Sequence, residues 1–227
     1  MNKQLIIKTS LLLILASATP AIADSSLLPM YGGEDRSNDP ELSEKDNTFI
    51  AKATRSFSSR EHAAEGYVER GFDMYSQNKF DKAMQAFNQA WLLDPNNPYP
   101  YLGFGLMLKN EKKFCKTIAM FLQAHQKGLY ENGFLADYAH ATTRCALTRE
   151  NQLQKKLFDD ANILYNRAIQ TPNNALRAYV YHSWAKSYFL QNDFSNSLAM
   201  IEQSKILGGK IDAALDQSLK EKIMEAN

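Results

Sequence analysis

Small and aromatic residues recur along the middle of this chain at a spacing of 34 residues. Gly71 and Gly105 are 34 residues apart. Other pairs at the same spacing are Tyr67 and Tyr101, Phe80 and Phe114, Phe87 and Phe121, and Ala90 and Ala124. A period of this length is typical of a solenoid built from helix pairs. The pattern therefore predicts an all-α protein that presents an extended surface, not a catalytic pocket.

The residue types at these positions have a physical reason. Glycine and alanine let two antiparallel helices cross closely, and aromatic side chains fill the space beside the crossing. A single helix pair cannot bury its apolar face, so three or more units must stack. We expect four units, at about residues 64–97, 98–131, 132–174 and 175–209.

The first two units resemble the tetratricopeptide repeat (TPR). The matching positions are Tyr67, Gly71, Phe80, Ala83, Phe87, Ala90 and Pro95 in the first unit, and Tyr101, Phe104, Gly105, Phe114, Phe121 and Ala124 in the second. Arg70 stands where the family has Leu, and Thr117 where Ala is usual. Units three and four follow by spacing, with Ser197 and Ser204 in place of Ala. The resemblance covers about residues 58–209 and implies a TPR-like α-solenoid that binds a protein or peptide.

In this family the first helix of each unit lines a concave surface, and the resemblance places the lining here by register. The residues are Val68, Phe72, Tyr75, Tyr99, Leu102, Leu106, Ala136, His140, Thr143, Tyr179, His182, Lys186 and Phe189. This set is largely apolar and aromatic, and such side chains concentrate interface energy. Val68 and Phe72 occupy places where some members clamp a carboxyl terminus with Lys and Asn, which disfavours a chaperone-tail adaptor. The alternative is that the ends of the chain or self-association cover the groove.

Residues 1–23 have the pattern of a bacterial secretory signal peptide. Lys3 and Lys8 precede a short apolar run, and Ala21–Ala23 forms an A-x-A cleavage site after Pro20. The run is shorter than the roughly 20 residues that a membrane span requires, and no cysteine follows it to take a lipid anchor. We expect cleavage after Ala23 and export to the periplasm or beyond, with no membrane span after cleavage. An uncleaved membrane anchor is the alternative.

Residues 24–46 are predicted to be a flexible acidic tether. Seven acidic residues stand against two basic residues in this segment, and such a composition does not support a folded core. The exception is the apolar patch Leu27–Tyr31, which could dock on the protein's own groove or on another protein.

Both ends of the solenoid are predicted to be capped. Residues 47–57 have apolar residues spaced for one face of a short helix, and Ser58 with Glu61 forms a capping box that begins the next helix at Ser58. The solenoid domain then extends over 58–227. At its carboxyl end, Gly208 and Gly209 end the last unit. Apolar residues every fourth position predict a closing helix over 210–226.

The third unit is longer than the others by about ten residues, added around Thr148–Lys156 and mostly polar. The simplest interpretation is an extended helix that projects from the stack. Insertions in repeat proteins often fall on the binding face, and a solvated hairpin without a partner is the equal alternative.

Two cysteines, Cys115 and Cys145, are predicted to form a disulfide. Cys115 lies near the start of one expected helix and Cys145 near the end of the next, and antiparallel neighbours bring these ends together. Export would place both in an oxidising compartment. Two free thiols are the alternative.

The remaining chemistry argues against other classes of protein. The formal charge of +1 gives no field that would favour nucleic acid. None of the four histidines has metal-ligand spacing, and no nucleophile elbow or phosphate loop is present. We therefore expect no catalytic residues, no cofactor and no metal. One open possibility is that His140 and His182, on adjacent first helices, share a ligand or titrate together.

The sequence predicts a non-enzymatic scaffold that mediates protein contacts in the bacterial cell envelope. Two alternatives are a secreted factor that acts on a host and an accessory subunit of an envelope enzyme.

Overall fold

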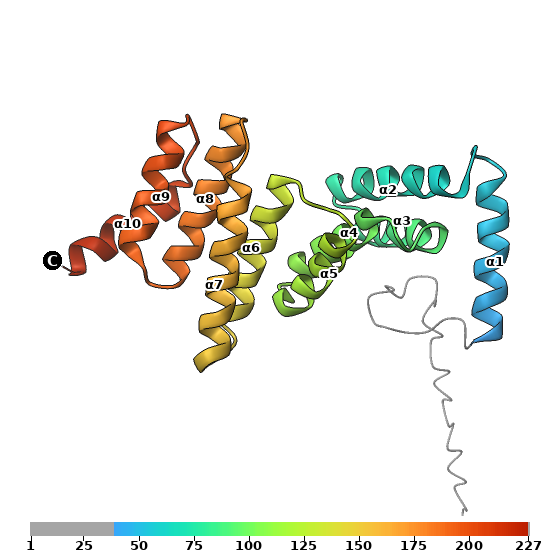
Figure 1. Ribbon diagram of the computed structural model, residues 1–227, viewed down its shortest axis with the longest axis horizontal. Helices are drawn as coiled ribbons and strands as arrows, with labels where there is room; N and C mark the ends of the chain where they lie inside the picture. The colour runs from blue at the N-terminus through green and yellow to red at the C-terminus, as the bar shows by residue number, and fades with distance from the viewer. Residues whose placement is uncertain (1–38, 227) are drawn as a thin grey trace, which may run out of the picture.

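The computed structural model describes residues 39–226, and this part of the chain folds into ten α-helices (Figure 1). The helices are α1 (Pro40–Thr54), α2 (Arg60–Ser76), α3 (Phe80–Leu93), α4 (Pro98–Asn110), α5 (Phe114–Gln126), α6 (Asn132–Ala146), α7 (Asn151–Ala168), α8 (Asn174–Leu190), α9 (Phe194–Ile206) and α10 (Ala213–Ala226). None of these described helices is both long and apolar enough to cross a bilayer. The predicted signal peptide, the Leu27–Tyr31 patch and the rest of residues 1–38 lie outside the described residues.

Eight helices form four pairs, α2 with α3, α4 with α5, α6 with α7, and α8 with α9. Within each pair the two helices pack extensively on each other, and the pairs stack along the chain (Figure 1). The predicted all-α helix-pair solenoid is therefore confirmed.

The glycines of the 34-residue pattern lie where the helices of a pair cross. A methyl group at Gly71 would collide with the ring of Phe87, and one at Gly105 would collide with the ring of Phe121. Both rings are completely buried. The recurring Gly and Phe are thus two halves of one contact, because the ring occupies the volume that any larger residue would need.

The third and fourth units make this contact with other residues. Tyr165 takes the place of Phe in the third unit and is completely buried, where its hydroxyl lies 2.7 Å from Ser187 Oγ. In the fourth unit, the buried Ser197 and Ser204 donate hydrogen bonds to the carbonyl oxygens of Ala185 and Ala178 at 2.9 and 2.8 Å. Polar residues are tolerated here because each hydroxyl has a partner.

The amino-terminal cap begins earlier than expected. The tether was predicted to extend to residue 46, but α1 starts at Pro40. Asp39 caps it, with Oδ1 accepting hydrogen bonds from the N–H groups of Glu41 and Leu42. Carboxylates that suggested disorder by composition instead stabilise a helix amino terminus.

The N-cap of the first repeat helix also lies one residue later than predicted. Its N-cap is Ser59, not Ser58, and Ser59 Oγ accepts a hydrogen bond from the N–H of His62 at 3.1 Å. Phe57 lies in the connecting turn rather than in a helix. The α1 helix contacts the stack through Phe49, whose ring meets that of Tyr67 edge-on at 5.4 Å.

At the carboxyl end, Gly208 adopts a left-handed backbone conformation with φ of 80°. The closing helix α10 begins at Ala213 rather than at 210, because Asp212 Oδ1 accepts a hydrogen bond from the N–H of Ala214. Leu215 and Leu219 are buried against Ile201 of α9 and close the core.

The extra residues of the third unit lengthen its second helix. The α7 helix has 18 residues, against 14 in α3 and 13 in each of α5 and α9, whereas α6 with 15 residues is shorter than α2 and α8 with 17 each. The amino-terminal end of α7, which follows the turn from α6, projects below its neighbours (Figure 1). The predicted insertion is thus helical from Asn151 onward, and residues 148–150 lie in the turn that joins α6 to α7.

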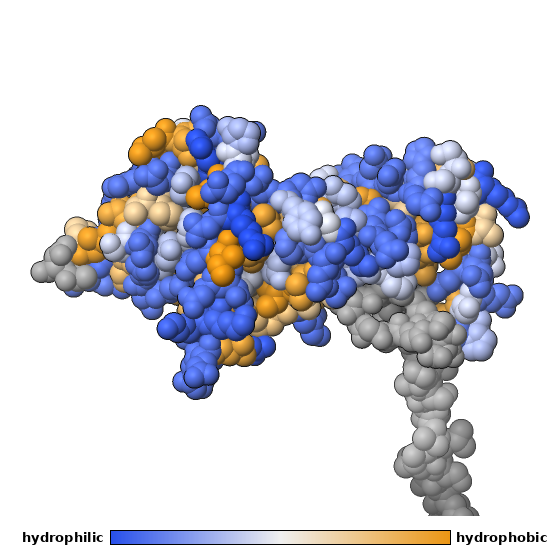
Figure 2. All heavy atoms as spheres, in the orientation of Figure 1, coloured by the Kyte–Doolittle hydropathy of each residue, from blue (hydrophilic) through white to orange (hydrophobic). Residues whose placement is uncertain are grey.

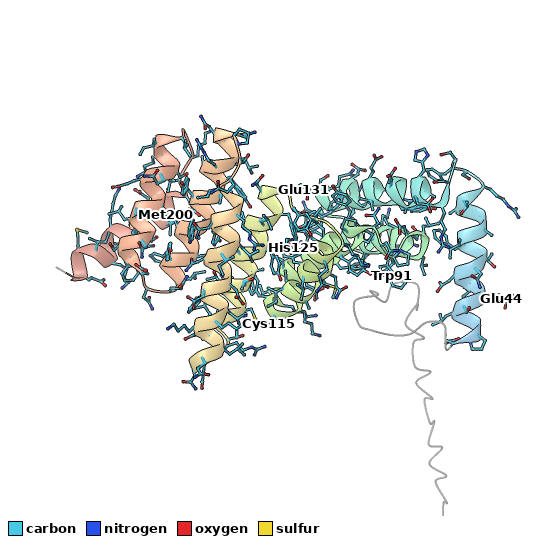
Figure 3. All side chains as sticks on the ribbon, viewed as in Figure 1. Glu44, Trp91, Cys115, His125, Glu131 and Met200 are labelled. Carbon is cyan, nitrogen blue, oxygen red and sulfur yellow. A yellow bond between two sulfur atoms is a disulfide. The ribbon has the colours of Figure 1, made fainter. Side chains whose placement is uncertain are left out.

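Cys115 and Cys145 form a disulfide, as predicted, with 4.8 Å between their Cα atoms. The bond joins the start of α5 to the end of α6, and Figure 3 labels Cys115 where α5 approaches α6. These two helices also provide most of the noncovalent contact between the second and third units. The disulfide therefore strengthens one junction of the stack.

We predict that the double substitution Cys115→Ser with Cys145→Ser lowers the free energy of unfolding by on the order of 3 kcal/mol, because the bond closes a loop of about 30 residues in the unfolded chain. Urea denaturation followed by circular dichroism measures the difference. Wild-type protein treated with reductant is the control and should match the variant. Equal stability of oxidised wild type and variant would contradict this role for the disulfide.

Candidate binding surface

The apolar residues predicted to line the concave surface are mostly used by the core. Val68 is only 7% exposed, and Ala136 and Thr143 are completely buried. Phe72 and Phe189 are half-buried, with rings 5.0 Å from that of Phe87 and 5.6 Å from that of Phe194. The expected apolar strip is therefore wrong for these positions, because the first helices are turned so that they face neighbouring helices.

Leu102 and Leu106 of α4 are likewise half-buried against the main core cluster. Tyr75 is half-buried, and its hydroxyl donates to Asn110 Oδ1 at 3.2 Å. Only part of the surface of each of these three residues is therefore open to a partner.

Two predicted tyrosines are well exposed, and both are held in place. Tyr99 is 38% exposed and donates to Glu131 Oε1 at 2.8 Å, while Tyr179 is 45% exposed and donates to Asp137 Oδ1 at 3.1 Å. The pKa of Tyr99 is raised mainly by the hydrogen bond to Glu131. The pKa of Tyr179 is raised mainly by burial of its hydroxyl and then by the charge of Asp137. Both rings therefore stay neutral and rigid at physiological pH.

Polar residues on α6 and α8 align in register across the contact between these helices. On each helix they are spaced by three and then four residues, which places them on one face. The pairs related by 42 residues are Asp137 with Tyr179, His140 with His182, and Arg144 with Lys186. The two helices pack directly on each other, and the first pair is hydrogen-bonded. We call these six residues the inner ladder.

Asp137 connects three successive first helices. Its Oδ1 atom accepts hydrogen bonds from Lys109 Nζ of α4 at 2.6 Å and from the Tyr179 hydroxyl of α8 at 3.1 Å. The Lys109 and Asp137 side chains are only 27% and 26% exposed. A charge-assisted bond in partial burial is stronger than a neutral one, so this carboxylate fixes the relative positions of units two, three and four.

The two histidines of the ladder are neutral near pH 7. The pKa of His140 is lowered to about 4, mainly by burial and then by the charges of Lys109 and Arg144. Its Nδ1 atom is buried and has no hydrogen-bond partner within the described part of the chain. The pKa of His182 is also lowered, first by burial and then by Lys186. The idea that the pair titrates together near neutral pH therefore fails for His140.

The carboxyl end of the ladder carries positive charge. Lys186 Nζ lies 3.4 Å from Asp212 Oδ2. The Arg144 guanidinium lies over the ring of Phe114 at 4.6 Å from its centre, and within residues 39–226 no carboxylate pairs with it. The last pair of the ladder, Arg144 with Lys186, thus consists of two cations, and Asp212 is the one carboxylate among the described residues that pairs with it.

A cavity of about 290 Å³ lies beside the ladder, between α8 and the turn that follows α9. Its walls are Ala175, Ala178, Tyr179, His182, Leu207, Gly208, Gly209 and Lys210. The small and apolar residues form most of this lining, and Lys210 is exposed at it. The cavity is therefore an open, mostly apolar hollow with one cation at its edge.

Sequence reasoning missed several of these residues. Lys109, Glu131, Asp137, Arg144 and Asp212 were not predicted to belong to the surface. The spacing of Asp137, His140 and Arg144 on one helix face was a signal that could have identified part of the ladder. Within the described residues no group of three or more potential metal ligands occurs.

The deciding observation for the fold is the 34-residue helix pair with glycine against a buried phenylalanine at its crossing. This is a TPR-like fold. Outside the repeats, α1 and α10 close the two ends of the TPR-like stack.

No protein-family model matches the chain, and no curated protein matches it. A solved structure described as MamA MSR-1 C2 is 12% identical, with a TM-score of 0.49 over 79% of this chain and 95% of that one. A second, the crystal structure of YrrB, described as a TPR protein with an unusual peptide-binding site, is 15% identical, with a TM-score of 0.33 over 68% of this chain and 90% of that one. At this level of similarity they carry no information about what this TPR-like chain binds.

We predict that His140 makes the protein less stable in acid. Its folded-state pKa of about 4 lies below the usual value of 6.5, so between these pH values the unfolded chain binds a proton that the folded chain does not. Stability therefore falls as the pH drops through this window. The contribution between pH 7 and 4.5 should be on the order of 2 kcal/mol.

Urea denaturation of wild type and His140→Gln at both pH values tests this contribution. Other groups titrate in both proteins, so the relevant quantity is the difference between their losses of stability. The wild type should lose more than the variant, and equal losses would show that burial of His140 has no effect on acid stability.

Proposed function

We propose that this protein is an exported scaffold that holds a partner protein or peptide along the first helices α2, α4, α6 and α8. The fold supports this proposal because stacked helix pairs offer a long continuous surface and no enclosed reaction chamber.

The observation that carries the proposal is the pair of exposed, hydrogen-bonded tyrosines Tyr99 and Tyr179. Each presents an aromatic face whose orientation is fixed by a carboxylate, Glu131 in one case and Asp137 in the other. Tyrosine is enriched among residues that dominate binding energy. A fixed ring also loses little conformational entropy when a partner binds.

The proposed location is the bacterial cell envelope, in the periplasm or outside the cell. The signal-peptide pattern of residues 1–23 supports export. The Cys115–Cys145 disulfide agrees with it, because disulfides persist in oxidising compartments and are rare in the cytosol.

Substitution of both exposed tyrosines, Tyr99→Ala with Tyr179→Ala, is predicted to weaken capture of the partner by at least about tenfold, because hot-spot residues each contribute about 2 kcal/mol or more. The assay is in-cell crosslinking of tagged protein, followed by mass spectrometry of the captured proteins. Tyr75 and Phe189 are less suitable targets, since their rings contact Phe80 and Phe194 and their loss would disturb packing.

Tyr130→Ala is the matched control for this experiment. Tyr130 is also an exposed tyrosine, at 61%, but its ring lies against His125 of α5 and not on the inner ladder. Capture should survive this change. Loss of capture in the control, or unchanged capture in the double variant with full helicity, would argue against the proposed surface.

Export can be tested separately. The protein recovered from a periplasmic extract or culture medium should begin at Asp24, as measured by amino-terminal sequencing. Ala23→Arg should leave the precursor uncut, because the cleavage site requires a small residue. A cytosolic protein that begins at Met1 would contradict the proposed location.

A further inference from the structure

The inner ladder has more positive charge than its own carboxylates neutralise. Asp137 is already bonded to Lys109 and Tyr179. Asp212 Oδ1 accepts a hydrogen bond from the N–H of Ala214, and Asp212 Oδ2 lies beside Lys186 Nζ.

Arg144 and Lys210 form no ion pair within the part of the chain that the structure describes. Arg144 extends from α6, and Lys210 follows the turn beside α8. Lys186 Nζ pairs with Asp212 Oδ2 at 3.4 Å, and the Lys186 side chain is still 38% exposed. Arg144 and Lys186 thus lie at the carboxyl end of the ladder, Asp212 pairs with Lys186, and Lys210 lies at the neighbouring cavity.

We propose that the inner ladder binds an acidic side chain of the partner, with an apolar residue close to it in the partner sequence. This inference rests on the proposed function. The carboxylate would lie between Arg144 and Lys186, where a guanidinium offers a planar pair of donors.

The apolar neighbour would enter the cavity walled by Ala178, Leu207 and Tyr179. Lys210 stands at the same cavity and adds a second attraction for negative charge. The partner that fits is therefore an extended segment in which Asp or Glu lies close to an aliphatic or aromatic residue, held by charge on one side and by burial on the other.

The histidines leave the charge of the ladder to its Arg and Lys residues. His140 and His182 are neutral near pH 7 and add no charge to the ladder, so the positive charge there comes from the Arg and Lys side chains. The uncharged Tyr179 hydroxyl holds Asp137 away from the last rung. The ladder residues whose charge is not fully neutralised are the cations Arg144 and Lys186, and they would repel a basic segment.

Selection of random peptides displayed on phage against the full chain tests the proposal without knowledge of the partner. Enriched peptides should contain Asp or Glu beside an apolar residue. A labelled peptide from this set should lose affinity by roughly tenfold when its acids are changed to amides, since partly exposed charge pairs contribute modestly each. Binding should also weaken as sodium chloride is added.

The protein variants are Arg144→Gln with Lys186→Gln, and the matched control Lys82→Gln with Lys155→Gln. The control removes two exposed cations from the second helices α3 and α7. The first variant should bind the acidic peptide roughly tenfold more weakly, and the control should bind it like wild type. Circular dichroism of both variants establishes that they are folded.

The outcomes separate this inference from the proposed function. If no peptide is enriched, or if enriched peptides ignore Tyr99→Ala with Tyr179→Ala, the proposed function itself fails. If enriched peptides need the tyrosines but lack acids and bind the Arg144 and Lys186 variant normally, only the acidic preference is overturned.

A third outcome concerns the chain's own amino-terminal segment, which contains Glu34 and Asp35. If Glu34→Gln with Asp35→Asn makes the full chain bind the acidic peptide more tightly, that segment competes for the ladder. In that case the protein's own amino-terminal segment, and not an external partner, would bind the inner ladder, and the proposal would be wrong. Unchanged affinity supports an external partner.

Discussion

The structure depends on the close approach of two helices at the crossing inside each unit. At Gly71 and Gly105 the absence of a side chain lets the backbone of one helix contact a phenylalanine ring from the other. The buried rings of Phe87 and Phe121 then fix the distance between the helices, because interiors tolerate little change in volume. The first two units are held together by this contact, the third and fourth by buried residues with hydrogen-bonded hydroxyls, and the surface is built by stacking these units.

Stacking consumes most of the apolar surface of the first helices. Val68, Phe72 and Phe189 face neighbouring helices and contribute to the core. The residues left on the inner side are polar or amphipathic, and they are bonded to one another between units. Asp137 is the clearest case, since a single carboxylate joins α4, α6 and α8. An inner side held in this way is preorganised, which reduces the entropy lost when a partner binds.

Hydropathy on the visible face of the molecule agrees with this division of roles. Figure 2 shows orange patches scattered among blue over α7 and its neighbours rather than one continuous apolar strip. Leu153 and Ile163 of α7 are among the exposed apolar residues. On the first helices the exposed large hydrophobic side chains are the tyrosines Tyr99 and Tyr179, whose hydroxyl groups can hydrogen-bond with water.

Much of this protein was determined by sequence alone. The 34-residue period predicted the helix pairs, since the spacing of small and aromatic residues reflects contacts within one unit. The disulfide followed from the antiparallel order of α5 and α6, which places Cys115 beside Cys145. Such features depend on neighbours that are close along the chain.

The chemical character of the inner surface was decided only by the tertiary structure. Whether a residue of a first helix faces the core or the partner depends on how each unit rotates against the next, and the period does not fix that rotation. The same holds for Asp39, whose carboxylate counted towards disorder in the composition but caps α1 in the fold. Sequence specifies the unit because its contacts are local, whereas the surface arises from contacts such as that of Asp137 with Tyr179, between residues 42 positions apart.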